Sequence, residues 1–187
     1  MIKVVLDACV LYPAPLRAFL LNLASNELID PFWSEEIQNE LIRSLLRNRP
    51  DLKRENLERT CRNMDSHFPK GSVRGYESLM PTLTLPDWND RHVLAATIHA
   101  KAKSIVTFNL DDFPKAALEL YGIEAVPPEQ LALQLIQSDP AHVLQAAKDH
   151  RLSLTRPPKT VDEYLATLEK QKLPKTVAFL REHKDNL

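Results

Sequence analysis

Short apolar runs along the chain have the pattern of strands in a parallel sheet. Residues 2–6 are β-branched and nearly all apolar, as strands covered on both faces are, and residues 104–108 form a second strand-like run. Residues 124–126 form a shorter run ahead of a proline pair, and residues 82–85 alternate as a strand would. Residues 29–33 fit either a strand or a connector. These runs predict the strands of one sheet.

Apolar residues recur at helical spacing between the strand-like runs. One such stretch starts behind Pro13. Another starts behind Ser34, a favourable N-cap followed by two glutamates that suit the positive end of a helix dipole. A charged third stretch covers residues 52–64, a fourth begins near Asp87, and a fifth covers residues 114–121. Strands alternating with helices in this order predict an α/β domain.

The pattern becomes wholly helical toward the carboxyl end. Helical spacing predominates after residue 129, and two further short helices are expected at residues 161–170 and 175–183. We therefore expect an α/β domain over residues 1–138 and a helical C-terminal extension over residues 139–187.

Length and composition are those of an ordinary soluble protein. The 187 residues are 44% hydrophobic and 26% charged, and the net charge of −1 indicates no general affinity for nucleic acid. The only cysteines, Cys9 and Cys61, form no CxxC pair, which argues against a disulfide scaffold or a zinc site. No apolar run approaches the roughly 18 residues of a membrane span, and Met1 leads directly into the first predicted strand. We therefore expect a cytoplasmic protein with no membrane partner.

Acidic residues lie at the ends of the predicted elements. Asp7 directly follows the first strand, Asp90 opens a helix, and residues 109–112 follow the strand at residues 104–108. In an open parallel sheet, residues just past the carboxyl ends of strands meet in one crevice. Carboxylates gathered there repel each other unless a cation is present, so the pattern indicates a magnesium or manganese site and favours phosphoryl chemistry.

Each of these acidic residues also has a purely structural interpretation. Asp7 could cap the turn that follows it, and Asp87 and Asp90 could cap the next helix. Glu40, on the helix behind Ser34, could be an ordinary solvated glutamate. For Asp87 we favour capping. For Asp90 the apolar helix and strand that follow it favour a functional role.

Four motifs together resemble the PIN domain family across residues 2–137. The motifs are residues 5–11 (VLDACVL), Glu40 within SEEIQNEL, residues 90–96 (DRHVLAA) and residues 105–113 (IVTFNLDDF). PIN domains are metal-dependent nucleases with a three-layer fold, in which helices flank a central, mainly parallel sheet. Many bacterial members are toxin ribonucleases of toxin–antitoxin pairs, the VapC-like group. The resemblance therefore implies a PIN-like nuclease domain over residues 1–138.

By this resemblance, Asp7, Glu40 and Asp90 match the family's acidic metal-binding positions, so we take them as ligands of Mg²⁺ or Mn²⁺. Asn109 falls where many members carry a fourth Asp. An amide ligates more weakly and carries no charge, which leaves open whether one or two ions bind. Asp112 could partly substitute for the missing carboxylate. These five residues are the candidate catalytic residues.

The resemblance implies a divalent-metal-dependent endoribonuclease with an RNA substrate, neutralised as a toxin by a small antitoxin protein. Related toxins often form homodimers, and the oligomeric state stays open. Two alternatives also remain. One is a metal-dependent phosphatase or DNA nuclease with the same site. The other is a non-catalytic PIN-like module that binds RNA or protein, an alternative favoured by Asn109.

Several neighbours of the acidic positions have competing interpretations. Thr107 either hydrogen-bonds an acidic ligand or the attacking water, or fills a strand with its β-branched side chain. Cys9 is interpreted as a small apolar filler. The histidines form no metal-binding pair. His92 and His99 are expected on the surface of a helix, where His92 would be close enough to Asp90 to contact a substrate.

Basic and aromatic residues near the acidic positions also leave choices open. Residues 41–75 are locally basic, with Arg43, Arg47 and Arg54 among them, and form either a cradle for a phosphate backbone or a solvated face. Trp33 and Trp88 flank the acidic positions in sequence. Stacking on bases and burial would each explain them, and we favour burial.

Overall fold

The computed structural model describes residues 1–187 and contains two compact units. The first, here called the sheet unit, comprises Ile2–Tyr12 and Asp30–Val126. The second, here called the helical unit, comprises Pro13–Ile29 and Pro127–Leu187 together with Met1. Each unit is thus built from separate stretches of the chain.

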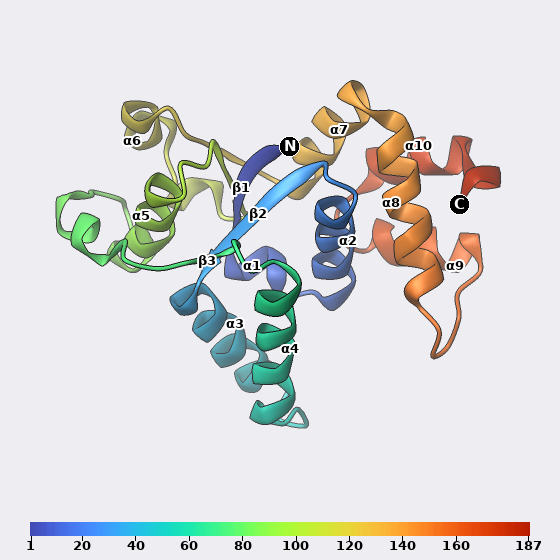
Figure 1. The fold of residues 1–187 in the computed structure, drawn as a ribbon, viewed down its shortest axis with the longest axis horizontal. Coiled ribbons are helices and arrows are strands. Elements are labelled where there is room, and N and C mark those ends of the chain that lie inside the picture. The colour runs from blue at the N-terminus through green and yellow to red at the C-terminus, as the bar shows by residue number, and fades with distance from the viewer. The chain divides into compact units, whose positions relative to one another are not determined.

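The sheet unit is built on a five-stranded parallel sheet with the strand order β3-β2-β1-β4-β5. Figure 1 labels β1, β2 and β3. The strands are β1 (Ile2–Leu6), β2 (Ile29–Ser34), β3 (Ser72–Val73), β4 (Ser104–Val106) and β5 (Glu124–Val126). β1 lies at the centre of this order, and Val4, Val5 and Leu6 are fully buried, as a strand covered on both faces requires. The predicted α/β class with a central parallel sheet is confirmed.

Five helices and four 3-10 turns complete the sheet unit. The helices are α1 (Ala8–Leu11), α3 (Glu35–Asn48), α4 (Arg54–His67), α5 (Arg91–His99) and α6 (Lys115–Leu118). The turns are η1 (Glu77–Thr82), η2 (Trp88–Asp90), η3 (Leu110–Asp112) and η4 (Glu119–Tyr121).

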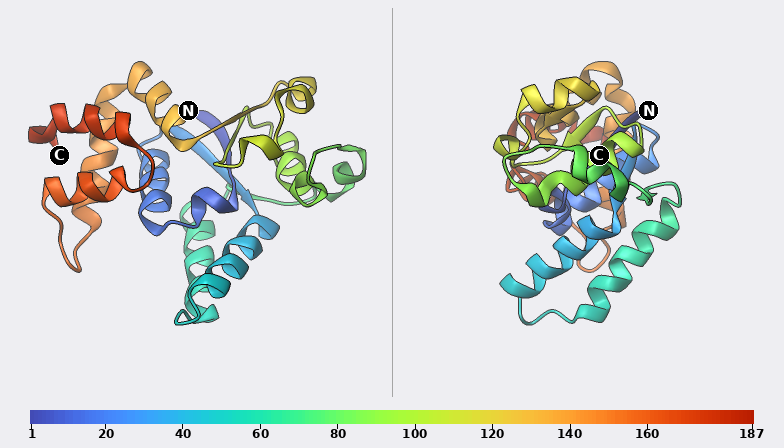
Figure 2. Two further views of the ribbon diagram at one scale, coloured as in Figure 1. Left: turned by 180° about the vertical axis from the view of Figure 1, so that it is seen from behind. Right: turned by 90° about the vertical axis from the view of Figure 1, so that its left-hand side faces the viewer.

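Helix α3 begins where the sequence predicts. Ser34 caps it, because its side chain accepts a 3.2 Å hydrogen bond from the Ile37 amide. Ile37 and Leu41 form the buried stripe of the helix. α3 and α4 pack against each other, and Figure 2 shows this pair extending away from the sheet. The face of α3 opposite the buried stripe is therefore not used in the core.

Two details of the sheet differ from the sequence prediction. Residues 82–85 form no strand: the chain there leaves η1 between Pro81 and Pro86, and its alternation reflects the burial of Leu83 and Leu85. The short strand β3 was not predicted. It follows Gly71, where an added Cβ would lie 2.9 Å from a backbone oxygen of the strand β2, so glycine permits the close approach of the two strands.

The helical unit contains α2 (Ala14–Ser25), α7 (Pro128–Ser138), α8 (Pro140–Ser153), α9 (Val161–Glu169) and α10 (Pro174–Glu182). α2 packs against α8, and α10 packs against both α7 and α9. The helices expected near residues 161–170 and 175–183 are therefore present. α2 and α7 pack with the helices that follow residue 138. The boundary expected at residues 138/139 would instead place α2 and α7 in the α/β domain, and this boundary stays a prediction. No helix in either unit is both long and apolar enough to cross a membrane.

Candidate active site

The ends of two neighbouring strands bring Asp7 and Thr107 together. Leu6 of β1 pairs with Val106 of β4, so the next residue of each strand extends the same edge of the sheet. The Asp7 amide donates a 3.1 Å hydrogen bond to the Val106 carbonyl, which continues the pairing by one residue. Both side chains are buried, and the Thr107 hydroxyl donates a 2.7 Å hydrogen bond to Oδ2 of Asp7. Of its two interpretations, Thr107 therefore takes the first, as a partner of an acidic side chain.

Cys9 joins the same cluster and is not merely an apolar filler. Its thiol donates a 3.1 Å hydrogen bond to Oδ2 of Asp7 and lies 3.3 Å from the Thr107 hydroxyl. Its sulfur also accepts a 3.2 Å hydrogen bond from the Phe108 amide. Burial, followed by the charge of Asp7, raises the pKa of Cys9 to about 12. The thiol is therefore protonated at neutral pH and acts as a donor that fixes the Asp7 carboxylate.

Glu40 on α3 is held by a histidine that the sequence prediction misplaced. Nε2 of His92 lies 3.1 Å from Oε1 of Glu40. His92 is buried, whereas it was expected on the helix surface, because α5 is enclosed on nearly all sides along residues 92–97. His99, at the other end of α5, is exposed as expected. His92 thus restrains the carboxylate of Glu40, as Thr107 restrains that of Asp7.

Asp90 lies half-buried at the end of η2 and is electrostatically coupled to the other acidic residues. Burial raises the pKa of Asp90 to about 7, with further contributions from the charges of Asp112, Asp7, Asp87 and Glu40, in that order. Four separate carboxylates are therefore close enough to Asp90 to oppose its ionisation. Asp87 itself accepts a 2.8 Å hydrogen bond from the Asn89 amide, which confirms its predicted role as a cap.

One open cavity of about 560 Å³ collects most of the predicted site within the sheet unit. Asp7, Glu40, Asp90 and Asn109 all line it. Asp112, at the end of η3, is not among the lining residues. Its negative charge contributes to the raised pKa of Asp90. Four of the five predicted residues thus meet in one place.

The donors in this cavity fit a hard divalent cation by their chemistry. Mg²⁺ and Mn²⁺ prefer oxygen ligands, and the predicted residues present three carboxylates and one amide oxygen. A cation would also relieve the repulsion that raises the pKa of Asp90. No three His, Cys, Asp or Glu side chains are already drawn together as a metal-binding group.

The basic segment divides into two parts. Arg43 and Arg47, both on α3, line the acidic cavity. Arg43 also pairs with Glu36 at 2.8 Å and lies 3.9 Å from Glu40.

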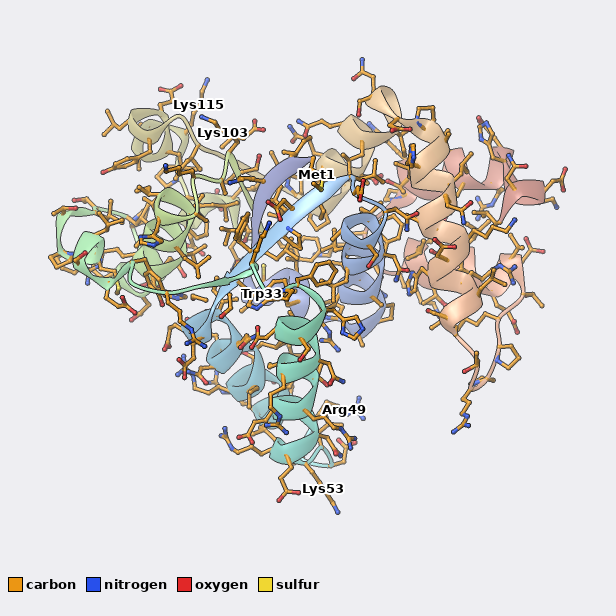
Figure 3. All side chains as sticks on the ribbon, viewed as in Figure 1. Met1, Trp33, Arg49, Lys53, Lys103 and Lys115 are labelled. Atoms are coloured by element: carbon orange, nitrogen blue, oxygen red, sulfur yellow. The ribbon has the colours of Figure 1, made fainter.

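The remaining arginines of interest lie at the outer end of the α3–α4 pair. Arg49 there pairs with Asp51 at 2.7 Å, and Arg54 pairs loosely with Glu58 at 3.9 Å. Figure 3 shows Arg49 and Lys53 at this end. Of these four arginines, Arg43 and Arg47 are the two that line the cavity.

The two tryptophans have different environments. Trp33 is fully buried, as predicted, and its indole nitrogen donates a 2.8 Å hydrogen bond to Asp65. Figure 3 shows it within the sheet unit. Trp88 is 65% exposed, so the predicted burial is wrong for this residue. It lies on the short turn η2, which is outside the sheet and its covering helices.

Comparison with known proteins defines the class of this fold and site. The family model described as the PIN domain matches residues 3–111, which is more than half of the chain, and the protein therefore belongs to the PIN domain family. A second model, the VapC50 C-terminal domain, matches residues 128–182.

One similar protein adds detail at the level of single sequences. It is "Putative ribonuclease VapC50" of Mycobacterium tuberculosis (strain ATCC 25618 / H37Rv), which is 42% identical over 59 residues. The matched segment covers 32% of this chain and 34% of the relative, about a third of each. No solved structure matches the chain.

Proposed function

We propose that the protein is a divalent-metal-dependent endoribonuclease that hydrolyses RNA phosphodiester bonds. The observation that carries this proposal is the meeting of Asp7, Glu40, Asp90 and Asn109, from four separate segments, in one open cavity of the sheet unit. Membership of the PIN domain family and the ribonuclease name of a partial relative support the same activity.

In this proposal Asp7, Glu40 and Asp90 hold Mg²⁺ or Mn²⁺, with Asn109 and Asp112 beside them. When bound, such an ion lowers the pKa of a coordinated water and offsets negative charge on the phosphoryl group. The surrounding side chains place the ligands. Thr107 and Cys9 both donate to Oδ2 of Asp7, which leaves Oδ1 without a donor from either of them.

His92 and the α3 arginines complete the proposed machinery. His92 fixes Oε1 of Glu40 and leaves Oε2 for a ligand. Such orienting hydrogen bonds commonly change metal affinity or activity by about 10–100-fold when removed. Arg43 and Arg47 supply positive charge on the same cavity and contact the phosphate backbone of the RNA.

The biological role that we propose is that of a toxin acting in the cytoplasm and neutralised by a small antitoxin protein. The match of residues 128–182 to the VapC50 C-terminal domain supports this role, because VapC-like PIN proteins are the toxins of such pairs. Expression of the protein should arrest growth, and co-expression of a small protein encoded beside it should relieve the arrest. Growth that is unaffected by expression would contradict the toxin role and leave the nuclease activity open.

The nuclease activity is tested by removing one charge from the site. Asp7→Asn is nearly isosteric, and we expect it to abolish RNA cleavage and to weaken Mn²⁺ binding by about tenfold or more, roughly 1.4 kcal/mol. Titration calorimetry with Mn²⁺ and a gel assay of RNA cleavage measure the two effects. The matched control is Asp51→Asn, an exposed aspartate at the outer end of the α3–α4 pair, which should change neither.

The substrate class is tested with a panel of single-stranded RNA, duplex DNA, nucleotides and phosphomonoesters, each with and without Mn²⁺. Cleavage confined to RNA supports the proposal. Cleavage of DNA or phosphomonoesters instead would assign the same site to another enzyme class. RNA cleavage that survives Asp7→Asn would rule out Asp7 as a metal ligand.

A further inference from the structure

Trp88 is a large aromatic side chain that the fold leaves uncovered. It is 65% exposed, whereas the other tryptophan of the chain is fully buried. Tryptophan is highly buried on average, because its indole ring carries much apolar surface. An uncovered indole in a cavity wall is therefore a candidate contact for a ligand.

The exposed ring is held in place by Arg91. The guanidinium carbon of Arg91 lies 4.0 Å from the centre of the Trp88 ring, as in a cation–π pair. Arg91 is itself fixed, because Nε donates to the Trp88 carbonyl at 3.0 Å and an NH group donates to the Met80 carbonyl at 3.3 Å. One face of the indole is thus covered by a fixed cation, and the exposure of the ring must come from the rest of its surface. A pre-oriented ring loses little conformational entropy when a ligand stacks on it.

Trp88 lies next to the proposed catalytic cavity. It lines a second open cavity of about 630 Å³ in the sheet unit, together with Arg91 and His92. This cavity shares Glu40, Arg43 and Asn89 with the cavity that holds the acidic residues. The two cavities therefore adjoin at these three residues, and a ligand chain that crosses them would contact both cavities.

We propose that Trp88, backed by Arg91, stacks on an unpaired nucleobase of a single-stranded RNA whose phosphodiester lies in the acidic cavity. This assignment rests on the proposed function, since it names the form of RNA that the same site takes. Single-stranded binding sites combine a charged track for the backbone with aromatic rings for the bases. Here Arg43 is shared by both cavities and Trp88 supplies the ring. A base inside a duplex has both faces covered and cannot stack in this way.

Binding of short RNA without metal tests the proposal separately from cleavage. The probe is a five-nucleotide single-stranded RNA, titrated into the full chain in EDTA while tryptophan fluorescence is recorded. Because Trp33 is buried, quenching should arise from Trp88. Trp88→Ala should weaken binding by about tenfold or more, in line with the loss of one base–aromatic stack. Trp88→Phe should bind within about threefold of the wild type but show no quenching.

Two controls separate stacking from general effects. Tyr121→Ala removes an exposed ring from another cavity of the same unit and should leave RNA binding unchanged. An RNA of equal length with abasic positions should bind the wild type and Trp88→Ala equally, because it offers no base.

The outcomes distinguish this proposal from the proposed function. If RNA binding depends on Trp88 but no divalent metal supports cleavage, the stacking site is supported and the proposed nuclease activity is contradicted. If the protein cleaves RNA, and Trp88→Ala binds RNA with unchanged affinity and quenching, the stacking site is overturned. The exposed ring would then be assigned to contact with a protein partner. Failure of the wild type to bind the short RNA at all would overturn it as well.

Discussion

At the scale of single residues, the site depends on side chains that hold other side chains. Thr107 and Cys9 both donate to one oxygen of Asp7, and His92 contacts one oxygen of Glu40. None of the three supplies a carboxylate, yet each restricts where a carboxylate can be. A metal site assembled from separate segments needs such restraint, because freely rotating ligands would lose entropy on binding.

Thr107→Val tests this restraint with little change in shape. The substitution removes the hydroxyl that donates to Asp7 and should lower RNA cleavage by about tenfold or more, with weaker Mn²⁺ binding. It should also cost about 1–3 kcal/mol of unfolding free energy, because Asp7 loses one of its two side-chain donors and the backbone amide of Asn109 loses its acceptor. Thr97→Val is the matched control: Thr97 is equally buried and its hydroxyl donates to the Val93 carbonyl within α5. Equal loss of cleavage in both variants would show that the effect is one of stability alone.

Asn109→Asp tests the departure of this chain from the family pattern. Asn109 lines the acidic cavity, and its backbone N–H donates a 3.0 Å hydrogen bond to the Thr107 hydroxyl. An added carboxylate should tighten Mn²⁺ binding by about tenfold, roughly 1.4 kcal/mol, and lower the Mn²⁺ concentration needed for cleavage. Calorimetry and cleavage at graded Mn²⁺ measure both. If neither changes, residue 109 lies outside the metal shell.

The residue scale shows where sequence patterns reach their limit. Asp7 and Asp90 were predictable because they directly follow or open an element whose apolar pattern is plain. The role of His92 was not predictable, because Glu40 lies 52 residues away in the chain. Cys9 lies only two residues from Asp7, but its contact with Thr107 joins positions that are 98 residues apart. No local pattern distinguishes a buried histidine that holds Glu40 from one on a helix surface.

At the scale of elements, α3 contributes both an acidic and two basic side chains to one cavity. Glu40, Arg43 and Arg47 recur at intervals of three and four residues, so they lie along one side of the helix. The buried stripe of Ile37 and Leu41 fixes the other side against the fold. An amphipathic helix thus presents one carboxylate and two guanidinium groups to the same cavity.

Neutralising the two α3 arginines should weaken RNA binding through the phosphate backbone. Arg43→Gln with Arg47→Gln should reduce the slope of log affinity against log salt by about 0.7 for each phosphate that an arginine no longer neutralises. Binding of a single-stranded RNA at four or more salt concentrations in EDTA measures this slope. Arg49→Gln with Arg54→Gln, at the outer end of the α3–α4 pair, is the control and should leave the slope unchanged. If the two double variants show the same slope, the α3 arginines do not contact the phosphates and form only a solvated face.

In the helical unit, His150 makes stability depend on pH. Burial, with a smaller contribution from Lys159, lowers the pKa of His150 from 6.5 to about 4. The unfolded chain therefore binds more protons between these pH values, and the unfolding free energy should fall by about 3 kcal/mol as pH drops from 6.5 to 4. Denaturant titrations across this range should show the decline, and His150→Gln should remove it. His99→Gln, at an exposed position, should leave the decline intact; a decline that persists in His150→Gln would have another source.

Element prediction succeeded where periodicity and burial agree. Residues 2–6 form a strand as predicted, and Val4, Val5 and Leu6 in it are fully buried. The strand predicted at residues 104–108 is shorter and ends at Val106, and the next residue, Thr107, donates to Asp7. Residues 82–85 failed because alternation there reflects two buried leucines between prolines rather than pairing with another strand. The two-residue strand β3 has no periodicity to detect, and its position depends on the close approach at Gly71.

At the scale of the whole molecule, the connectivity of the two units matters for how they fold. α2 is encoded between β1 and β2 but packs against α8, which is encoded more than a hundred residues later. The helical unit therefore cannot complete its core until the last part of the chain is present. Periodicity in the sequence identifies these helices but contains no information about which of them pack together.

A chain that ends at residue 138 tests this organisation directly. It keeps α2 and α7 but lacks α8, α9 and α10, so apolar side chains such as Leu16, Phe19 and Leu131 are deprived of the helices that cover them. We expect circular dichroism to show a loss of helix beyond that of the 49 residues removed (187 minus 138), together with a lower melting temperature. Adding residues 139–187 as a separate peptide should restore part of the signal, because the missing helices return. Full cooperative melting of the shortened chain by itself would instead support a self-sufficient domain over residues 1–138, and would show that α2 and α7 need no partner from the C-terminal helices.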